Sequence, residues 1–394
     1  MKIVHVEDFF HPDAGYQINL LAKYMAKCGH EVIIVTSQMD KMPNHLKTFF
    51  GKENIEQRDK FYMDQTNVKI IRAPIWKYFS GRVIYKREIF KMIDSLNPDV
   101  LYVHGNDTLI GIQYILRVNR IKYKLILDSH MLQMASENKF SKVFKWYYRN
   151  FITPIIVKNR LIVIRTQNDP YVESYLGIPL NQCPWISVGT DTLKFKADEQ
   201  QRKQMRMKYG INDNEFVVLY AGKLDESKGG MLLAETCKQK IEDKFGQKIT
   251  FAIIGNSEGE YGQTIEQIFE KSQNKVLRLP TQLYTELPSF YQMADIAVFA
   301  KQCSLSFYDV QSCGLPVVFE DNNVNLARIQ QKNGVAFKKM SLADFRSKIE
   351  YFAQMDENNL KRYSRNAVNY IKRNYDYYDI TQKYLEIINT QLNS

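Results

Sequence analysis

The stretch Phe216-Val-Val-Leu-Tyr-Ala-Gly-Lys-Leu-Asp-Glu-Ser-Lys-Gly-Gly230 indicates the fold of this chain. Its first six residues form an unbroken apolar run, which is typical of a strand buried on both faces of a parallel sheet. Gly222 lets the backbone approach a ligand closely, and Lys223 and Lys228 supply cationic donors ahead of a helix expected near Gly229. The pattern predicts a phosphate-binding turn, with an ordinary strand-to-helix turn bearing surface lysines as the alternative. Neither a Walker loop nor a dinucleotide fingerprint is present.

The size and charge of the chain narrow the class of protein and of partner. A length of 394 residues predicts two α/β domains, and 54 basic against 43 acidic side chains give a net charge of +11. Such a charge favours an anionic partner: a nucleotide diphosphate, a membrane surface or a nucleic acid. Because no helix-turn-helix, RNP-like or finger motif accompanies it, we expect no nucleic-acid partner.

The cysteines and the N-terminus bear on the compartment. Five widely spaced cysteines without a Cys-x-x-Cys pair favour reduced thiols in a cytoplasmic protein over a structural zinc site. The first residues enter a strand directly without a secretory leader, and no window approaches the apolar length of a membrane span. We therefore expect a cytoplasmic protein.

Hydrophobic periodicity predicts two successive runs of strands alternating with helices, the mark of doubly wound parallel sheets. A polar stretch after Lys196 places the boundary between a domain of residues 1–197 and a domain of residues 198–375, followed by a C-terminal helix over 376–394. The expected strands are 2–6, 31–36, 68–73, 100–104, 125–127, 161–165 and 185–188, then 216–221, 250–254, 276–279, 296–300 and 316–319.

Six short motifs, none specific alone, carry a resemblance through their order and spacing. They are Pro12-Asp-Ala-Gly15 with the helix after it, Asn97-Pro-Asp-Val-Leu-Tyr-Val-His104, Asp128-Ser-His130, Ser187-Val-Gly-Thr-Asp191, Ala221-Gly-Lys-Leu-Asp-Glu-Ser-Lys-Gly229 and Asp309-Val-Gln-Ser-Cys-Gly-Leu-Pro-Val-Val318. Over nearly its full length the chain resembles the GT-B glycosyltransferases, specifically the retaining enzymes of glycosyltransferase family 4. The resemblance implies two Rossmann-like domains facing a central cleft, with a C-terminal helix crossing back to the N-terminal domain.

The resemblance also implies an activity and a set of site residues. The family transfers a sugar, without a metal, from a nucleotide-diphosphate sugar held by the C-terminal domain to an acceptor held by the N-terminal domain. The implied catalytic residues are His130, Lys223 and Lys228, although a histidine capping a strand end is the alternative for His130. Lys223 stands where the family usually has Arg. The implied donor-binding residues are Gly15, Gly222, Gly255, Leu283, Lys301, Ser306, Phe307 and Asp309, with Gly255 and Leu283 at the base pocket.

The largest departure from the family concerns its pair of glutamates separated by seven residues. Asp309 falls at the second, which accepts hydrogen bonds from the ribose, and Lys301 falls at the first, which contacts the donor sugar. Two explanations stay open: an acidic donor sugar whose carboxylate pairs with Lys301, or a degenerate and slow site.

The segment Lys139–Arg160 holds six cations, no acid, and aromatic residues at helical spacing. It suits an anionic membrane surface and a lipid-linked acceptor, or alternatively an amphipathic helix with a buried face and a solvated basic face. The histidines share no metal-ligand spacing, so we expect no metal and no cofactor beyond the nucleotide-sugar co-substrate.

The favoured function is a retaining glycosyltransferase acting on a glycan or lipid-linked acceptor, in the biosynthesis of surface polysaccharide or glycolipid. A catalytically inactive GT-B subunit that binds a partner enzyme or a glycan is the main alternative, supported by Lys301. A sugar-nucleotide epimerase of the same fold ranks third.

Overall fold

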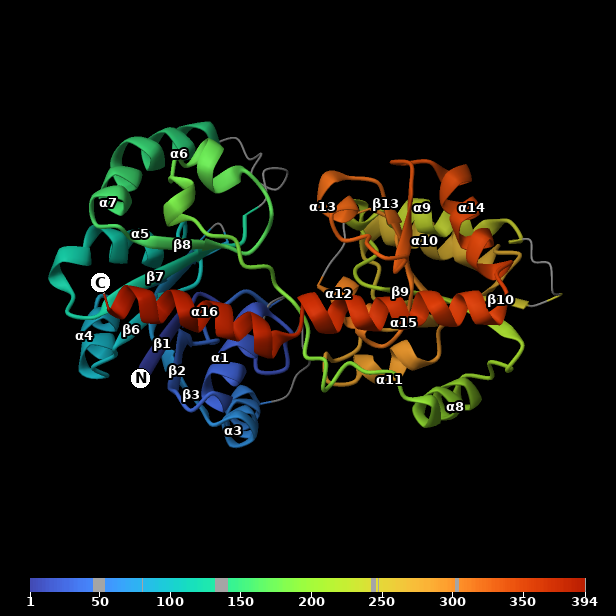
Figure 1. Ribbon diagram of the computed structural model, residues 1–394, viewed down its shortest axis with the longest axis horizontal. Coiled ribbons are helices and arrows are strands. Elements are labelled where there is room, and N and C mark those ends of the chain that lie inside the picture. The colour runs from blue at the N-terminus through green and yellow to red at the C-terminus, as the bar shows by residue number, and fades with distance from the viewer. Residues whose placement is uncertain are drawn as a thin grey trace. The chain divides into compact units, whose positions relative to one another are not determined.

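Figure 1 shows the computed structural model, which describes residues 1–44, 54–79, 81–131, 141–241, 246, 248–301 and 305–393. The chain divides into two compact units: unit 1 comprises Met1–Val188 and Tyr377–Ser394, and unit 2 comprises Gly189–Asp376. The N-terminal segment of unit 1 thus ends at Val188, ahead of the boundary at 197 drawn from composition. The polar stretch used for that boundary begins a helix of unit 2, because the Asp198 side chain accepts from the Gln201 N–H and caps α8 (Glu199–Lys208).

The described residues of unit 1 form a six-stranded parallel sheet in the order β3-β2-β1-β6-β7-β8. The chain winds outward in one direction from β1 and in the other from β6, so these neighbours form the switch point where open α/β sheets bind ligands. This confirms the predicted Rossmann-like sheet. Its strands are β1 (Lys2–Glu7), β2 (Glu31–Ser37), β3 (Val68–Ala73), β6 (Val100–Val103), β7 (Lys124–Ser129) and β8 (Ile162–Arg165).

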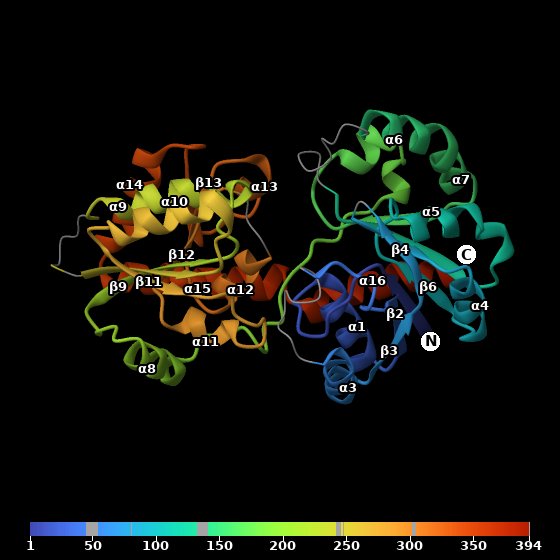
Figure 2. The ribbon, with the colours of Figure 1, turned by 180° about the vertical axis from the view of Figure 1, so that it is seen from behind.

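Two details of unit 1 differ from the prediction. The strand expected at 185–188 is wrong, because only an isolated bridge joins Trp185 to Arg165. An antiparallel hairpin of β4 (Ile75–Phe79) and β5 (Arg82–Tyr85), visible in Figure 2, was not predicted, since Pro74 and adjacent charges obscure its alternation. The helices are α1 (Gln17–Lys27), α3 (Ile55–Thr66), α4 (Glu88–Ser95), α5 (Leu109–Leu116), α6 (Ser141–Tyr147), α7 (Thr153–Lys158) and α16 (Tyr377–Leu392), with π-helical turns at Tyr148–Ile152 and Tyr171–Tyr175 and 3-10 turns at Val118–Arg120 and Leu180–Gln182.

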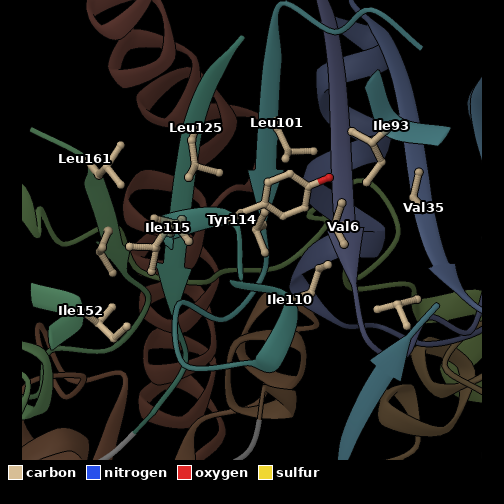
Figure 3. Packing of buried hydrophobic residues seen from close by; sticks show 14 of the residues in the cluster. Val6, Val35, Ile93, Leu101, Ile110, Tyr114, Ile115, Leu125, Ile152 and Leu161 are labelled. Atoms are coloured by element: carbon tan, nitrogen blue, oxygen red, sulfur yellow. The ribbon is translucent and has the colours of Figure 1, made fainter. Parts of the chain in front are cut away.

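The strands of unit 1 are apolar on both faces because both faces are covered. Alternate side chains such as Val6, Leu101 and Leu125 point to the face covered by α5, where they meet Ile110 and Tyr114 (Figure 3). The residues between them face a second cluster that is filled from α1 and α16. Because both faces of the sheet are buried, its strands need continuous apolar runs in the sequence.

Helix α16 belongs to unit 1 although it ends the chain. Tyr377, Ile380, Tyr384 and Ile388 are all buried in the cluster with α1 and the sheet, and the Tyr384 hydroxyl accepts from Gln17 Nε2 at 2.7 Å. Figure 1 shows α16 running beside α1. The C-terminal residues thus complete the core of the first unit.

The described residues of unit 2 form a second six-stranded parallel sheet, ordered β11-β10-β9-β12-β13-β14, with its switch point between β9 and β12. The strands are β9 (Glu215–Ala221), β10 (Lys248–Ile254), β11 (Lys275–Leu279), β12 (Ile296–Phe299), β13 (Val317–Glu320) and the unpredicted edge strand β14 (Gly334–Phe337). Besides α8, the helices are α9 (Gly230–Lys238), α10 (Gly259–Glu270), α11 (Leu287–Gln292), α12 (Ser306–Ser312), α13 (Asn323–Leu326), α14 (Leu342–Ala353) and α15 (Glu357–Asn374), with a 3-10 turn at Glu226–Lys228.

Candidate active site

In unit 2, the turn between β9 and α9 is shaped by a glycine and fixed by hydrogen bonds on both sides. Gly229 lies in the left-handed region at φ +74°, which turns the chain from the 3-10 segment into α9. The Asp225 side chain caps this segment by accepting from the Lys228 N–H at 3.0 Å, and the Tyr220 hydroxyl donates to the Lys223 carbonyl at 2.6 Å. The turn is therefore held in one conformation from both sides.

Gly255 is required by a close approach of two turns. It follows β10, has φ +145°, and a Cβ atom there would lie 1.9 Å from the Gly222 carbonyl oxygen. The turn after β9 thus packs directly on the turn after β10, which brings Gly222 and Gly255 into contact.

The donors that this turn can offer a ligand are mainly lysine amines, because several of its backbone N–H groups already donate hydrogen bonds within the protein. The Gly230 N–H donates to the Asp225 carbonyl at 3.1 Å, and the Met231 N–H donates to the Tyr261 hydroxyl at 2.9 Å. Lys223 is exposed and Lys228 is half-buried. An anion here would meet lysine ammonium groups and the dipole of α9 more than open backbone N–H groups.

Beside the turn lies a surface pocket of about 360 Å³ at the carboxyl ends of β10 and β11. Gly255 lines it together with Arg278, whose guanidinium donates to the Gly255 carbonyl at 2.9 Å and to the Glu266 carboxylate at 2.7 Å. Leu283 does not line this pocket and lies in the following loop, where its carbonyl accepts from the Glu286 N–H. The structure brings Gly255, but not Leu283, to the pocket.

The predicted donor-binding residues around α12 have different surroundings. Phe307 is fully buried against Phe299 and Phe319, so its side chain packs the core, while Ser306 is half-buried at the helix start. The buried Asp309 carboxylate accepts from the Thr190 hydroxyl. Burial raises the pKa of Asp309 to about 7, against the lowering effect of that hydrogen bond.

In unit 1, the buried Asp128 carboxylate at the end of β7 connects several side chains. Its Oδ2 atom lies 3.0 Å from His104 Nδ1, 3.2 Å from His130 Nε2 and 3.1 Å from the Tyr102 hydroxyl, while Oδ1 accepts from the Gly105 N–H at 2.7 Å. The Thr166 hydroxyl lies 3.2 Å from His130 Nδ1. The ring of His130 is therefore oriented from both nitrogens while 41% of its side chain stays exposed.

The charges in this network stabilise one another. Burial by itself would raise the pKa of Asp128, but His130 and His104 hold it well below its usual range. Burial likewise would lower the pKa of His130, but the Asp128 charge and hydrogen bond raise it to about 9. At neutral pH the pair is an imidazolium held by a carboxylate.

His104, Asp128 and His130 also present ligand atoms within 4.8 Å of one another, a grouping that among the described residues could hold a metal ion. The spacing along the sequence did not indicate it, because β6 and β7 bring the two histidines together. His104 Nε2 also lies 3.0 Å from His5 Nδ1. These contacts satisfy the carboxylate within the protein, so we keep the metal-free interpretation as a proposal.

Carboxyl groups missed by the sequence analysis surround His130. Burial, and then the neighbouring Asp8 carboxylate, raise the pKa of Glu7 to about 8. Burial raises the pKa of Asp8 to about 6, and the Asp107 carboxylate pairs with Arg82 of the hairpin at 3.1 Å. Their position after β1 and β6 is the signal that would have found them. Gly15 lies half-buried in the loop after β1.

The described part of the basic segment, residues 141–160, forms α6, a π-helical turn and α7. Tyr148 and Ile152 are buried, whereas Trp146 and Phe151 are 61% and 53% exposed. The Lys145 ammonium lies 4.4 Å from the ring centre of Tyr175, so this cation turns toward the protein. Lys139 and Phe140 lie outside the described residues. No helix in the described part of the chain is long and apolar enough to span a membrane.

Part of the chain matches a known protein family. Residues 201–370 match the family described as "Glycosyl transferases group 1". An uncharacterized glycosyltransferase of Methanocaldococcus jannaschii is 25% identical over 228 residues, which cover 55% of this chain and 53% of the relative. The UDP-Gal:alpha-D-GlcNAc-diphosphoundecaprenol alpha-1,3-galactosyltransferase of Escherichia coli is 21% identical over 242 residues, covering 60% and 61%. The chain thus spans about half the length of the curated relatives that it matches.

Solved structures agree over the whole chain. A glycosyltransferase from Rickettsia africae aligns with a TM-score of 0.76 at 16% identity, covering 99% of this chain and 98% of the other. HepE of Anabaena in complex with UDP aligns with a TM-score of 0.75 at 14% identity, covering 99% and 100%. These likenesses confirm the predicted fold, that of the GT-B glycosyltransferases.

Proposed function

Residues 201–370 belong to the group 1 glycosyl transferases and lie in a chain of the GT-B fold, and from this premise we propose that the protein transfers a sugar from a nucleotide-diphosphate sugar to an acceptor hydroxyl. One observation carries the proposal: Lys223 and Lys228 lie on a rigid turn at the switch point of the unit 2 sheet, in contact with Gly255 and its pocket through Gly222. This is the place and the charge that a nucleoside diphosphate requires.

The lysines act on the leaving group. As the bond between the anomeric carbon and the diphosphate oxygen breaks, negative charge grows on that oxygen, and the ammonium groups of Lys223 and Lys228 stabilise it. The acceptor oxygen forms the new bond to the anomeric carbon, and its proton passes to the departing diphosphate. We expect retention of configuration, no divalent metal, and turnover unchanged by EDTA.

His130 orients the transferred sugar. Its two ring nitrogens are engaged by Asp128 and Thr166, so the imidazolium offers the sugar a positive charge in a fixed position and not a free N–H donor. We therefore assign it to positioning and electrostatic support, with Gly15 in the adjacent loop and Asp309 and Ser306 on the donor side.

The acceptor that we propose is a glycan or a lipid-linked sugar, in surface polysaccharide or glycolipid synthesis. Exposed Trp146 and Phe151 beside the cations of α6 and α7 suit the interface of an anionic membrane and support a peripheral location at the inner face of the cell membrane. The name of the E. coli relative, a galactosyltransferase acting on a diphosphoundecaprenol-linked sugar, supports this choice.

Isothermal titration with UDP, GDP and ADP tests the donor site. We expect one of them to bind, and Lys228→Ala to weaken it by about tenfold to a hundredfold. Lys203→Ala, which removes an exposed lysine from α8 of the same unit, is the matched control. If no nucleoside diphosphate binds, or if Lys228→Ala binds as tightly as the control, the proposal is wrong.

Two further measurements separate the remaining possibilities. Mass spectrometry of products from a donor and acceptor panel should detect transfer, whereas an inactive subunit would show neither transfer nor donor hydrolysis. Co-sedimentation with anionic liposomes tests the membrane surface: we expect Trp146→Ser with Phe151→Ser to reduce pelleting, and unchanged pelleting would exclude it.

A further inference from the structure

Lys301 lies at the switch point of unit 2 by topology. It follows β12, the strand that neighbours β9, and Lys223 follows β9. The carboxyl ends of both strands meet at the same edge of the sheet, at the point where the winding reverses. The two lysines therefore flank the position at which this class of sheet holds its ligand.

The stem and the ammonium group of Lys301 both contact the turn that carries Lys228. A Cβ atom on Gly229 would lie 3.1 Å from Lys301 Cβ and 3.2 Å from the Ala300 carbonyl carbon, so only a glycine admits this approach. Lys301 Nζ donates to the Glu226 carbonyl at 3.2 Å, two residues before Lys228.

The charge of Lys301 has no acidic partner in the described part of the chain. No carboxylate of the described residues forms an ion pair with it, although its side chain is half-buried. An ammonium group has three donors, and the Glu226 carbonyl accepts from one of them. The remaining donors and the full positive charge suit an anion placed against the same turn.

We propose that Lys301 is a third cation of the donor site and binds the diphosphate itself. This inference rests on the proposed function. Lys301 would then add a phosphate contact at a position where the family that this chain resembles has a sugar-binding carboxylate. The anchoring on the Glu226 carbonyl favours the diphosphate over a carboxylate of the donor sugar, because it holds the ammonium group on the turn that bears Lys228.

The test compares the affinity of each variant for a nucleoside diphosphate with its affinity for the corresponding monophosphate. The nucleoside diphosphate that binds wild type most tightly is titrated beside its monophosphate, using Lys301→Met, which keeps the stem and removes the charge, and Lys203→Met as the control. We expect Lys301→Met to lose about tenfold in affinity for the diphosphate and less than about threefold for the monophosphate. The affinity of Lys301→Arg for the diphosphate should stay within about threefold of that of wild type. The circular dichroism spectrum of Lys301→Arg should match the wild-type spectrum.

The outcomes separate this inference from the proposed function. If wild type binds the diphosphate and Lys301→Met changes the affinities for diphosphate and monophosphate equally, or changes neither, the role of Lys301 is wrong and the proposed function stands. Loss of affinity confined to UDP-glucuronate, with UDP and UDP-glucose unaffected, also overturns it and assigns Lys301 to an acidic sugar. A wild type that binds no nucleoside diphosphate overturns the proposed function and this inference together.

Discussion

The two units share one strand order, yet their switch points carry different side chains, carboxyl groups and a histidine in unit 1 and lysines in unit 2. In unit 1, the residues at the carboxyl ends of β1 and β6 include Glu7, Asp8 and His104, which are largely buried and bonded within the protein. In unit 2, the corresponding residues are Lys223 and Lys301, which reach solvent. The same backbone therefore supports a hydrogen-bonded internal network in one unit and solvent-accessible lysines in the other, since chemistry depends on the side chains at the strand ends.

The largest effect that we expect is on the buried network. Asp128→Ala should lower the free energy of unfolding of unit 1 by about 3–5 kcal/mol, because it leaves two histidines and the Tyr102 hydroxyl without their shared acceptor. Hydrogen exchange followed by mass spectrometry resolves the two units, and faster exchange should be confined to unit 1. Asp213→Ala, at an exposed site of unit 2, is the control. Unaltered exchange across β6 and β7 would show that the network contributes no stability.

The next effect concerns the contact between the two turns of unit 2. Gly255→Ala should cost about 3 kcal/mol and abolish nucleotide binding, because the added methyl group meets the Gly222 carbonyl oxygen. Gly210 also has a positive φ, +60°, but open space around it, so Gly210→Ala should cost only about 1 kcal/mol. Urea unfolding measures both. Equal costs would mean that the close approach is unimportant.

Raising the salt concentration should affect the exposed lysines of unit 2 more than the buried network around Asp128 in unit 1. Raising ionic strength from about 0.05 M to about 0.5 M should weaken nucleoside diphosphate binding several-fold, or about 1 kcal/mol, because the lysines of unit 2 are screened. The stability of unit 1 should hardly change, since solvent ions do not reach Asp128. Titration calorimetry and hydrogen exchange at both salt concentrations measure the two responses. Salt-independent binding would contradict a lysine-based site.

The smallest effect is a pH dependence from His130. Its pKa is raised from 6.5 to about 9, so the stability it contributes is complete below pH 6.5 and is lost as the pH rises through about 9. Because 41% of the side chain is exposed, solvent screening reduces the contribution to about 1 kcal/mol. Urea unfolding at pH 6 and pH 10 should therefore show a larger difference between wild type and His130→Gln at pH 6.

Glu7 is the control for this measurement, because its pKa of about 8 lies in the same range. The comparison is repeated in a Glu7→Gln background, where the His130 effect should persist. A difference between wild type and His130→Gln that is equal at both pH values would show that His130 is not charged in the folded protein.

Strands and glycine turns were predictable from local pattern. The central strands were found within a few residues of their bounds, because a strand buried on both faces leaves a continuous apolar run. The hairpin β4–β5 and the edge strand β14 were missed, since they are short and only partly buried. Phe307 was placed with the donor-binding residues by motif alone, and the structure buries it in the core.

By itself, the sequence determined the two doubly wound sheets and the lysine-bearing turn, because these follow from hydrophobic periodicity and glycine placement along the chain. Only the tertiary structure decided which distant residues meet. It joined His5, His104, Asp128 and His130 across three strands, set Lys301 against the turn of Lys228, and returned α16 to the core of unit 1. The physical reason is that parallel strands bring together the ends of segments that lie far apart in sequence, and no local pattern records that proximity.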